Sequence, residues 1–306
     1  MYDAIVIGGG PAGASAATLL GRALRHVLVI DAGATRNAPA NHLHGYLGLD
    51  GLAPTELNTR GRDEAQRYGC EWVQGKVASV QERNGCGFTV RDSGGRGHHA
   101  RSVIVATGLR DVLPSIPGID ELWGNRVIHC PYCHGYEVRN SRLGVVGGEN
   151  RAFTLHQAAL VRLWSDDVAI FPNTIELSED ERRRLTSWGV RIVDGRVRQV
   201  REDQSELTIE LANGEHVSRS TVFVGPTFVP NDALLGDLGC VRTDDGWIAA
   251  DETGATSVAG VWAAGNVADS PAQIIHAAAQ GARAGIAVNH YLLDQDIRSL
   301  DHTSGH

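Results

Sequence analysis

The sequence has little that would suit it to a nucleic acid or a membrane. No run of basic residues is longer than Arg182 to Arg184, and the 306 residues carry a formal net charge of −8. Phosphate backbones are bound by clustered Lys and Arg, so this composition argues against a nucleic acid partner. No window approaches the ~20 apolar residues of a transmembrane helix, and no basic segment precedes the apolar run Ala4 to Ile7. We therefore expect a cytoplasmic protein with no membrane span.

Cysteine is scarce as well. The five cysteines are an odd number in a long chain, which excludes a small fold held together by disulfides. Cys70, Cys86 and Cys240 stand alone, and we expect them to be buried or incidental thiols. Only Cys130 and Cys133 are close in sequence, and in a reducing compartment such a pair indicates redox chemistry.

Glycine, in contrast, is abundant. The chain has 37 glycines, and no repeat accounts for them. Glycine turns between strands and helices are typical of nucleotide-binding folds. The sequence predicts a strand at residues 3–7, a glycine turn, a helix up to residue 24 and a strand at 26–31, which form a βαβ unit.

The same pattern recurs in the middle third of the chain, with a strand at 143–148, a helix at 152–164 and a strand at 167–171. Further strands are predicted at 72–81, 87–91, 101–108 and 221–225, with an Ala-rich helix at 272–291 and a frayed tail from residue 294. The order predicts an α/β fold with two Rossmann-like dinucleotide-binding domains, each of three layers, the second inserted into the first. The predicted boundaries are 1–112 and 246–306 for the first domain and 113–245 for the second, which carries the CxxC pair.

The first glycine turn has the fingerprint of a dinucleotide site. Its pattern is Gly8-x-Gly10-x-x-Gly13, between a strand and a helix, and Asp31 follows 18 residues beyond Gly13. Gly8 permits the tight turn, Gly10 lets a pyrophosphate approach the backbone, and Gly13 packs the helix on the strand. Asp31 is predicted to accept hydrogen bonds from ribose hydroxyls; an ordinary βα turn is the alternative. The predicted cofactor-binding residues here are Gly8, Gly10, Pro11, Ala12, Gly13, Asp31 and Ala32.

The second glycine turn departs from that fingerprint. Glu149 takes the position of its second glycine, in Gly147-x-Glu149-x-x-Ala152. A side chain there obstructs a pyrophosphate, and a carboxylate repels it. The segment Phe171 to Thr174, after the next strand, has no Arg or Lys to pair with a 2′-phosphate. These features argue against NADPH binding and favour a scaffold that holds the CxxC pair.

The segment Cys130-Pro131-Tyr132-Cys133-His134 carries the clearest chemical signal. Two cysteines at this spacing close a small disulfide, and one sulfur of such a motif exchanges readily with thiols and other disulfides. Zinc, the main alternative, needs two further ligands, and the sequence has no second CxxC or clustered Cys/His pair, so no metal is expected. His134 titrates near neutral pH and is a candidate base, the alternative being a solvated histidine.

Two other segments place small residues where a cofactor can lie against the backbone, each at the end of a predicted strand. The helix after the second segment directs its N-terminus toward that segment, where its dipole would stabilise negative charge on a reduced flavin ring. A plain buried helix is the alternative. The candidate residues are Ala106, Thr107, Gly108, Gly265, Asn266, Gln273 and Ile274.

Together these residues resemble the low-molecular-weight thioredoxin reductase family of flavoproteins, from Tyr2 to about Leu292. The glycine turn, Asp31, the CxxC pair and the segment Gln273 to Gly281 stand in that family's order and approximate spacing. The resemblance implies bound FAD, a homodimer and a CxxC pair that lies against the isoalloxazine ring. Three features depart from the family: His134 replaces an acidic residue, Asn266 replaces an aspartate, and the NADPH-reading residues are missing.

The stretch CPYCHGYE looks more like one branch of this family, the dithiol oxidases that close disulfides in gliotoxin- and holomycin-type metabolites. In that branch molecular oxygen is the expected electron acceptor. By this resemblance Cys133 is the thiolate next to the flavin, Cys130 exchanges with the substrate, and His134 is the base. The resemblance also places the loop 41–48 as a wall against the flavin, with His44 as a candidate cofactor-binding residue; a solvated histidine is the alternative.

Three functions remain open from the sequence. The leading hypothesis is a flavin-dependent oxidase of a small-molecule dithiol. The second is a reductase in which NADPH or a ferredoxin-like donor supplies electrons through Cys130 to thioredoxin. The third is a redox-sensing flavoprotein whose CxxC pair reports oxidation to a partner.

Overall fold

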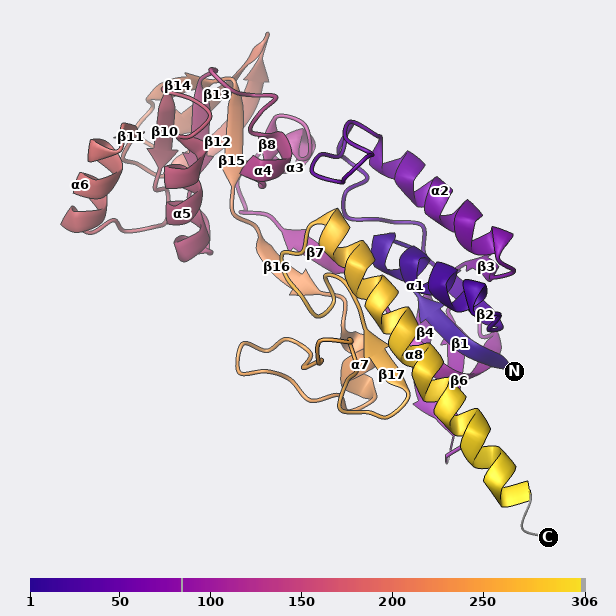
Figure 1. Cartoon of the computed structure of the whole chain (residues 1–306). Coiled ribbons are helices and arrows are strands. Elements are labelled where there is room, and N and C mark those ends of the chain that lie inside the picture. The colour runs from indigo at the N-terminus through magenta and orange to yellow at the C-terminus, as the bar shows by residue number, and fades with distance from the viewer. Residues whose placement is uncertain (84, 304–306) are drawn as a thin grey trace. The chain divides into compact units, whose positions relative to one another are not determined.

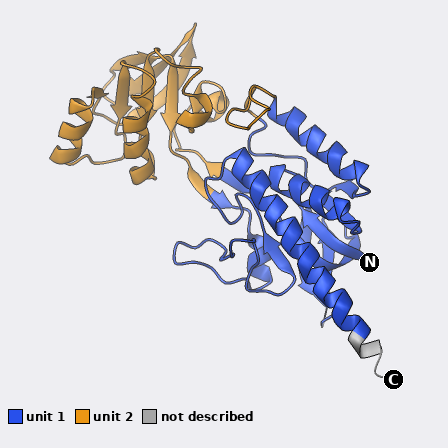
Figure 2. Cartoon of the chain, in the orientation of Figure 1, with its two compact units in different colours: residues 1–38, 53–110, 229–306 blue, residues 39–52, 111–228 orange. Residues whose placement is uncertain are grey.

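The computed structural model describes residues 1–83 and 85–303. The chain divides into two compact units (Figure 2). Unit 1 comprises residues 1–38, 53–110 and 229–306, and unit 2 comprises residues 39–52 and 111–228. Unit 2 is thus inserted into unit 1.

Unit 1 is built on a mixed sheet with the order β3-β2-β1-β6-β5-β4, in which β17 also pairs with β6 (Figure 1). The strands are β1 (Tyr2–Ile7), β2 (Val27–Asp31), β3 (Glu71–Gln74), β4 (Val77–Glu82), β5 (Phe88–Asp92), β6 (Gly97–Val105) and β17 (Val261–Ala263). The helices are α1 (Pro11–Arg22), α2 (Pro54–Arg67), α7 (Ala233–Asp237) and α8 (Ile274–Thr303).

The central strands of this sheet are buried on both faces. Along β1, Ala4 and Val6 join a core cluster with residues of α1 and α8, whereas Ile5 and Ile7 join a second cluster on the opposite face. Successive side chains of a strand point to opposite faces, so an uninterrupted apolar run marks a strand that is covered on both sides. The second cluster includes residues of β4, β5 and α7.

Helices α1 and α8 lie side by side over the first face of the sheet (Figure 1). Glycine allows this close approach. A Cβ atom on Gly281 would stand 1.9 Å from the carbonyl oxygen of Ala12, and a Cβ atom on Gly285 would stand 2.8 Å from the carbonyl oxygen of Ala16. The two backbones are therefore in direct contact, and no side chain fits between them at these points.

Unit 2 has a parallel sheet with the order β11-β10-β9-β15-β8. One face packs on an antiparallel sheet, β12-β13-β14, and the other packs on helices α5 and α6. The strands are β8 (Val127–Ile128), β9 (Leu143–Val146), β10 (Val168–Phe171), β11 (Val190–Ile192), β12 (Val197–Asp203), β13 (Glu206–Leu211), β14 (His216–Arg219) and β15 (Thr221–Val224). The helices are α3 (Ile119–Leu122), α4 (Pro131–His134), α5 (Arg151–Val161) and α6 (Glu179–Ser187). β7 (Leu109–Val112) and β16 (Thr227–Pro230) pair with each other where the chain enters and leaves this unit.

The mixed sheet of unit 1 and the parallel sheet of unit 2, each layered between further elements, confirm the predicted α/β fold of two Rossmann-like domains. The units divide at residue 228, whereas the sequence assigns residues up to 245 to the second domain. The physical reason is α7, since Leu234 and Leu235 pack into the core of unit 1. No helix in the described ranges is long and apolar enough to cross a membrane.

Several elements differ from the sequence prediction. Helix α2 is missing from that prediction because it is polar on most sides, and only Pro54 and Ala65 are buried. The strand predicted at 72–81 is divided into β3 and β4 at Gly75, whose N–H donates to the carbonyl oxygen of Asp31. Cys70 and Cys240 are buried as expected, and Cys86 is exposed.

The predicted frayed tail from residue 294 is wrong for residues 294–303, because α8 continues to Thr303. Asp296 holds this last part of the helix, with its carboxylate 2.7 Å from Arg25 and 2.6 Å from Arg101. Leu292, just before it, is fully buried. Residues 304–306 of the predicted tail lie outside the described residues.

The approach of α8 to α1 generates a prediction for Gly281→Ala. Alanine raises helix propensity, but its Cβ would collide with the carbonyl oxygen of Ala12 at 1.9 Å. We expect a net loss of about 1–3 kcal/mol in the free energy of unfolding. Gly236→Ala in α7 is the control, because its Cβ meets only the flexible end of Arg242 at 3.4 Å. A thermal or denaturant melt that ranks Gly281→Ala as no less stable than Gly236→Ala would contradict the close contact.

Candidate functional site

The first glycine turn lies between β1 and α1 and is shaped by two backbone contacts. Gly8 has φ +101°, and a Cβ there would stand 2.4 Å from the carbonyl oxygen of Ala106. A Cβ on Gly13 would stand 1.9 Å from the carbonyl oxygen of Gly8. These are the two roles that the sequence assigns to Gly8 and Gly13, a tight turn and close packing of helix on strand.

Gly10 differs from its neighbours because the space beside it is open. A Cβ on Gly10 would meet only Cγ2 of Thr35, at 4.0 Å. Gly10 is also the N-cap residue of α1, and no side chain caps the helix. The first N–H groups of α1 therefore face an open position that suits an anionic group such as a pyrophosphate.

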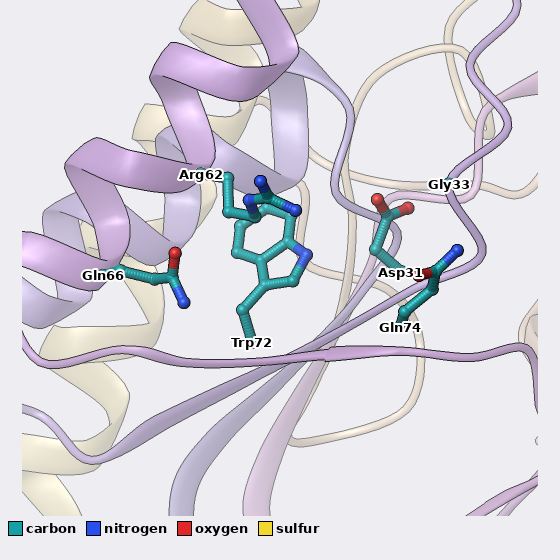
Figure 3. A pocket seen from close by; sticks show the side chains of 6 residues that line it. All are labelled: Asp31, Gly33, Arg62, Gln66, Trp72 and Gln74. Atoms are coloured by element: carbon teal, nitrogen blue, oxygen red, sulfur yellow. The ribbon is translucent and has the colours of Figure 1, made fainter.

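Asp31, at the end of β2, borders a cavity of about 240 Å³ (Figure 3). One carboxylate oxygen accepts a hydrogen bond from the N–H of Gly9 at 3.0 Å, which fixes the side chain beside the turn. The ring of Trp72 faces Asp31 across the cavity in Figure 3. The other lining residues are Gly33, Arg62, Gln66 and Gln74. An aromatic ring, amide groups and a carboxylate around one cavity suit the adenosine end of a dinucleotide.

The sequence predicts Asp31 and misses its neighbours in this cavity. Arg62 and Gln66 lie on α2, the helix that the sequence does not reveal. Trp72 and Gln74 lie on β3, which pairs with β2 so that Gln74 stands opposite Asp31. The pairing of β3 with β2 could have identified Gln74, because neighbouring parallel strands end at the same edge of a sheet.

The other predicted cofactor residues of unit 1 lie near the same turn. A Cβ on Gly265 would lie 3.0 Å from the Cβ of Ala12 and 3.6 Å from that of Ala277 in the first turn of α8. The N-terminus of α8 thus reaches Gly265, as the sequence predicts. The backbone carbonyl oxygen of Gln273 accepts a hydrogen bond from the N–H of Ala277 at 2.9 Å. Helix α8 begins at the next residue, Ile274.

Two asparagines organise the loops around this position. The side chain of Asn266 donates to the carbonyl oxygens of Asp269 and Ala272, which closes the loop before α8. Asn231, which sequence reasoning missed, accepts through its carbonyl oxygen from the hydroxyl of Thr107 at 2.7 Å, and its side chain donates back to the carbonyl oxygen of Thr107 at 2.9 Å. The adjacent Gly108 accepts from the N–H of Asn231.

The residues of unit 1 therefore fit the pyrophosphate and adenosine of a dinucleotide such as FAD. The open helix N-terminus at Gly10 suits the pyrophosphate, and the cavity at Asp31 suits the adenosine. Ala12 is buried between the turn and α8, Pro11 occupies the first helical position, and Ala32 is exposed directly after Asp31.

The CxxC pair lies in unit 2 at the start of the short helix α4. The sulfur atoms of Cys130 and Cys133 are 2.6 Å apart, so the pair is placed to open and close a disulfide. Both side chains are half-buried. Their exposure therefore does not show which thiol lies next to the flavin and which exchanges with the substrate. Tyr132 between them is 65% exposed, with its ring packed edge-on against Trp164.

His134 follows the pair and is the last residue of α4. Its Nδ1 atom is buried and has no hydrogen-bond partner. Burial is the main cause that lowers the pKa of His134, and the charge of His44 lowers it further, whereas the carbonyl of Cys130 and the carboxylate of Glu137 raise it. The neutral imidazole is therefore favoured at neutral pH, with a nitrogen that is able to accept a proton.

His44 does not lie in the unit that carries the glycine turn. It belongs to the segment 39–52, which is part of unit 2. Its Nδ1 is 3.2 Å from a carboxylate oxygen of Asp50, and its Nε2 is 3.5 Å from Glu137. The predicted role of His44 against a flavin stays a prediction, and the contacts within unit 2 connect it with the CxxC segment instead.

The second glycine turn, between β9 and α5, differs from the first at its helix N-terminus. The side chain of Asn150 caps α5 by accepting from the N–H of Phe153 at 3.2 Å. Glu149 precedes it, as the sequence shows. Within the described part of the chain, no group of three or more His, Cys, Asp or Glu side chains gathers in a way that would hold a metal ion.

An open dinucleotide turn in one Rossmann-like unit and a CxxC pair in the other define a flavin-dependent disulfide oxidoreductase. Residues 2–281 match the pyridine nucleotide-disulphide oxidoreductase family, and the chain belongs to that family. The thioredoxin reductase-like flavoprotein expected from the sequence is thereby confirmed, and membership in the family implies a bound flavin.

Relatives match over nearly the whole chain. The crystal structure of HlmI is 46% identical, covers 99% of this chain and 96% of that chain, and has a TM-score of 0.95. The thioredoxin reductase sirT of Leptosphaeria maculans is 31% identical over 97% of this chain and 96% of its own length. The thioredoxin reductase of Bacillus subtilis is 27% identical over 98% of each chain.

The geometry of the first turn predicts different results for valine at two neighbouring glycines. Gly10→Val should fold, because only Thr35 lies near, but its side chain would fill the open position at the helix N-terminus. We expect the purified variant to lose most of its flavin absorbance while its melting curve stays close to that of wild-type protein stripped of flavin. Gly8→Val should fail to fold, because of φ +101° and the 2.4 Å approach to Ala106. A Gly10→Val protein that keeps a full complement of flavin would refute this assignment.

Proposed function

We propose that this protein is an FAD-dependent dithiol oxidase, which forms a disulfide in a small-molecule dithiol and passes the electrons to molecular oxygen. The FAD is held by the residues of the first glycine turn, Asp31 and the segments at Ala106–Gly108 and Gly265–Ile274. Cys130, Cys133 and His134 carry the thiol chemistry. The protein acts as a homodimer in the cytoplasm.

The observation that carries this proposal is the contrast between the two helix N-termini. At α1 the N-cap is glycine and the first N–H groups are open to a phosphate. At α5 the side chain of Asn150 already occupies one of those N–H groups, and the carboxylate of Glu149 adds negative charge beside it. An anionic pyrophosphate is therefore disfavoured at α5, which argues against NADPH as the electron donor.

The surroundings of α5 support the same conclusion. Arg151, a cation at its start, is bound to the carboxylate of Glu181 at 2.7 Å, and this pairing lowers the pKa of Glu181 to about 2. Asn173, after β10, bridges two backbone segments by donating to the carbonyl oxygen of Gly147 and accepting from the N–H of Val197. A positive side chain that would read a 2′-phosphate is missing from residues 171–174.

The relatives support the family, and the motif supports the branch. HlmI is similar over the whole chain, and sirT and tcpT are among the relatives named as thioredoxin reductases. The CPYCHGYE motif, which resembles that of the dithiol oxidase branch, favours a dithiol oxidase over a reductase of proteins.

In the proposed reaction, the two cysteines have the roles that the resemblance to the family implies. His134 accepts the proton of a substrate thiol, and the resulting thiolate attacks the sulfur of Cys130, so that Cys133 leaves as a thiolate. The second substrate thiol then attacks the substrate sulfur of this mixed disulfide. The substrate leaves as a disulfide, and the cysteine pair remains with the two electrons and two protons of the substrate.

FAD, when bound, supplies a two-electron acceptor for the reduced pair, and oxygen ends the cycle as hydrogen peroxide. The net reaction converts one dithiol and one oxygen molecule into one disulfide and one peroxide, so atoms and electrons balance.

A disulfide reductase is the second candidate, favoured by the similarity to the thioredoxin reductase of Bacillus subtilis. In that function NADPH or a ferredoxin-like donor reduces the flavin, and electrons leave through Cys130 to thioredoxin. A redox sensor without turnover is the third, and no surface of the described residues specifically favours it.

An anaerobic titration of the flavin-loaded protein separates these functions. We expect a small dithiol alone to bleach the flavin absorbance, and NADPH to leave it unchanged, because the N-terminus of α5 is capped. Admitting air should restore the colour and produce one peroxide for each dithiol consumed. Rapid bleaching by NADPH, followed by electron transfer to thioredoxin, would establish the reductase instead.

Cys133→Ser tests whether unit 2 carries the thiol chemistry while unit 1 holds the flavin. We expect dithiol-driven bleaching to fall by at least about a thousandfold, because a serine hydroxyl cannot form the disulfide. Flavin content should be unchanged, since the dinucleotide turn belongs to unit 1. The matched control is Cys86→Ser, the same change at an exposed cysteine of unit 1. Equal loss in both variants, or a Cys133→Ser protein without flavin, would count against the assignment.

A further inference from the structure

The segment 39–52 packs within unit 2 and brings a second histidine to the dithiol site. Leu43 is buried, its N–H donates to the carbonyl oxygen of Leu52 at 2.8 Å, and its own carbonyl oxygen accepts from Gly51 at 2.9 Å. The loop is thus closed on itself around a buried anchor. His44, the next residue, is held in a defined position by that anchor.

The ring of His44 lies between two carboxylates. Nδ1 is 3.2 Å from Oδ1 of Asp50, which also accepts from the N–H of Gly45 at 3.2 Å. Nε2 is 3.5 Å from Oε1 of Glu137. The N–H of Gly45 and the His44 ring together lower the pKa of Asp50. Asp50 therefore stays ionised and orients the ring, so that its other nitrogen faces Glu137.

Glu137 connects this ring with the dithiol. It stands three residues after His134, and the chain keeps a helical turn there, because the N–H of Val138 donates to the carbonyl oxygen of His134 at 3.3 Å. Side chains three apart on a helical turn share a face. Glu137 thus contacts His44 from the loop and acts through its charge on His134 in its own turn.

We propose that His44 is a positioning residue of the dithiol site: by pairing with Glu137 it limits how far that carboxylate stabilises the protonated form of His134, so that the base stays neutral. The proposal rests on the proposed function, because that function makes His134 the base. The competition between the two histidines does not depend on turnover.

The charges around His134 give the direction of each effect. The charged side chains that act on it are Glu137, after α4, and His44, from the loop, and the two cysteines belong to the same short segment as His134. Glu137 raises the pKa of His134 and His44 lowers it. Without His44, Glu137 turns to the remaining histidine, so the pKa of His134 rises. Without Glu137, the pKa falls.

The experiment is a pH titration of the histidine Cε1–H signals by NMR in the oxidised protein, in which neither thiol of the pair titrates. The chain has 13 histidines, and the signal of His134 is assigned as the one lost in His134→Gln. For His44→Gln we expect the midpoint of His134 to move up by roughly half to one pH unit, the size of one nearby charge in a partly solvated site. For Glu137→Gln we expect it to move down.

A double-mutant cycle isolates the mechanism. In the Glu137→Gln background, adding His44→Gln should move the midpoint of His134 much less than in wild-type protein, because the competing carboxylate is gone. His42→Gln, at an exposed histidine of the same loop, is the matched control and should leave the midpoint unchanged. The remaining histidine signals show whether each variant is folded.

A His134 midpoint that stays in place in His44→Gln, or that moves equally with and without Glu137, would overturn the proposal. No dithiol, NADPH or oxygen enters this measurement. Its failure is therefore distinguishable from failure of the oxidase function, which the anaerobic titration tests.

Discussion

The structure of unit 1 depends on backbone approaching backbone where no side chain is allowed. Gly13 packs directly against the carbonyl oxygen of Gly8, and Gly8 packs against the carbonyl oxygen of Ala106. Gly281 packs in the same way against the carbonyl oxygen of Ala12. These contacts bring the end of β6, the turn after β1 and the N-terminal parts of α1 and α8 together. The open N-terminus of α1 follows from the same arrangement, since Gly10 has neither a capping side chain nor a close neighbour. The glycines thus set both the packing of the helices and the place for a phosphate.

Unit 2 shows that the same topology does not fix the same helix N-terminus. Its sheet is parallel and its β9–α5 turn also contains glycines, yet Asn150 caps the helix and Glu149 stands in front of it. A helix N-terminus attracts a phosphate only while its N–H groups are unoccupied. Two residues therefore change how a helix N-terminus meets a phosphate, and the fold alone does not reveal this difference.

The chemistry of unit 2 gathers around α4 instead. The thiols and His134 come from one short segment, whereas His44 comes from a loop far away in sequence. Burial favours the neutral form of His134, and the nearby carboxylate of Glu137 opposes it. The balance of these influences decides whether a histidine beside a dithiol takes up a proton at neutral pH.

The sequence by itself determined the features that are local in the chain: the glycine turn with Asp31, the CxxC pair with His134, the altered turn at Glu149, and the α/β order of elements. Each of these needs only residues that are neighbours along one strand, turn or helix. The tertiary structure alone decided what surrounds them. The polar helix α2 brings Arg62 to the Asp31 cavity, strand pairing brings Gln74 there, and the fold of the segment 39–52 brings His44 to Glu137. These contacts join residues far apart in the sequence, and they follow from packing and pairing that no local pattern encodes.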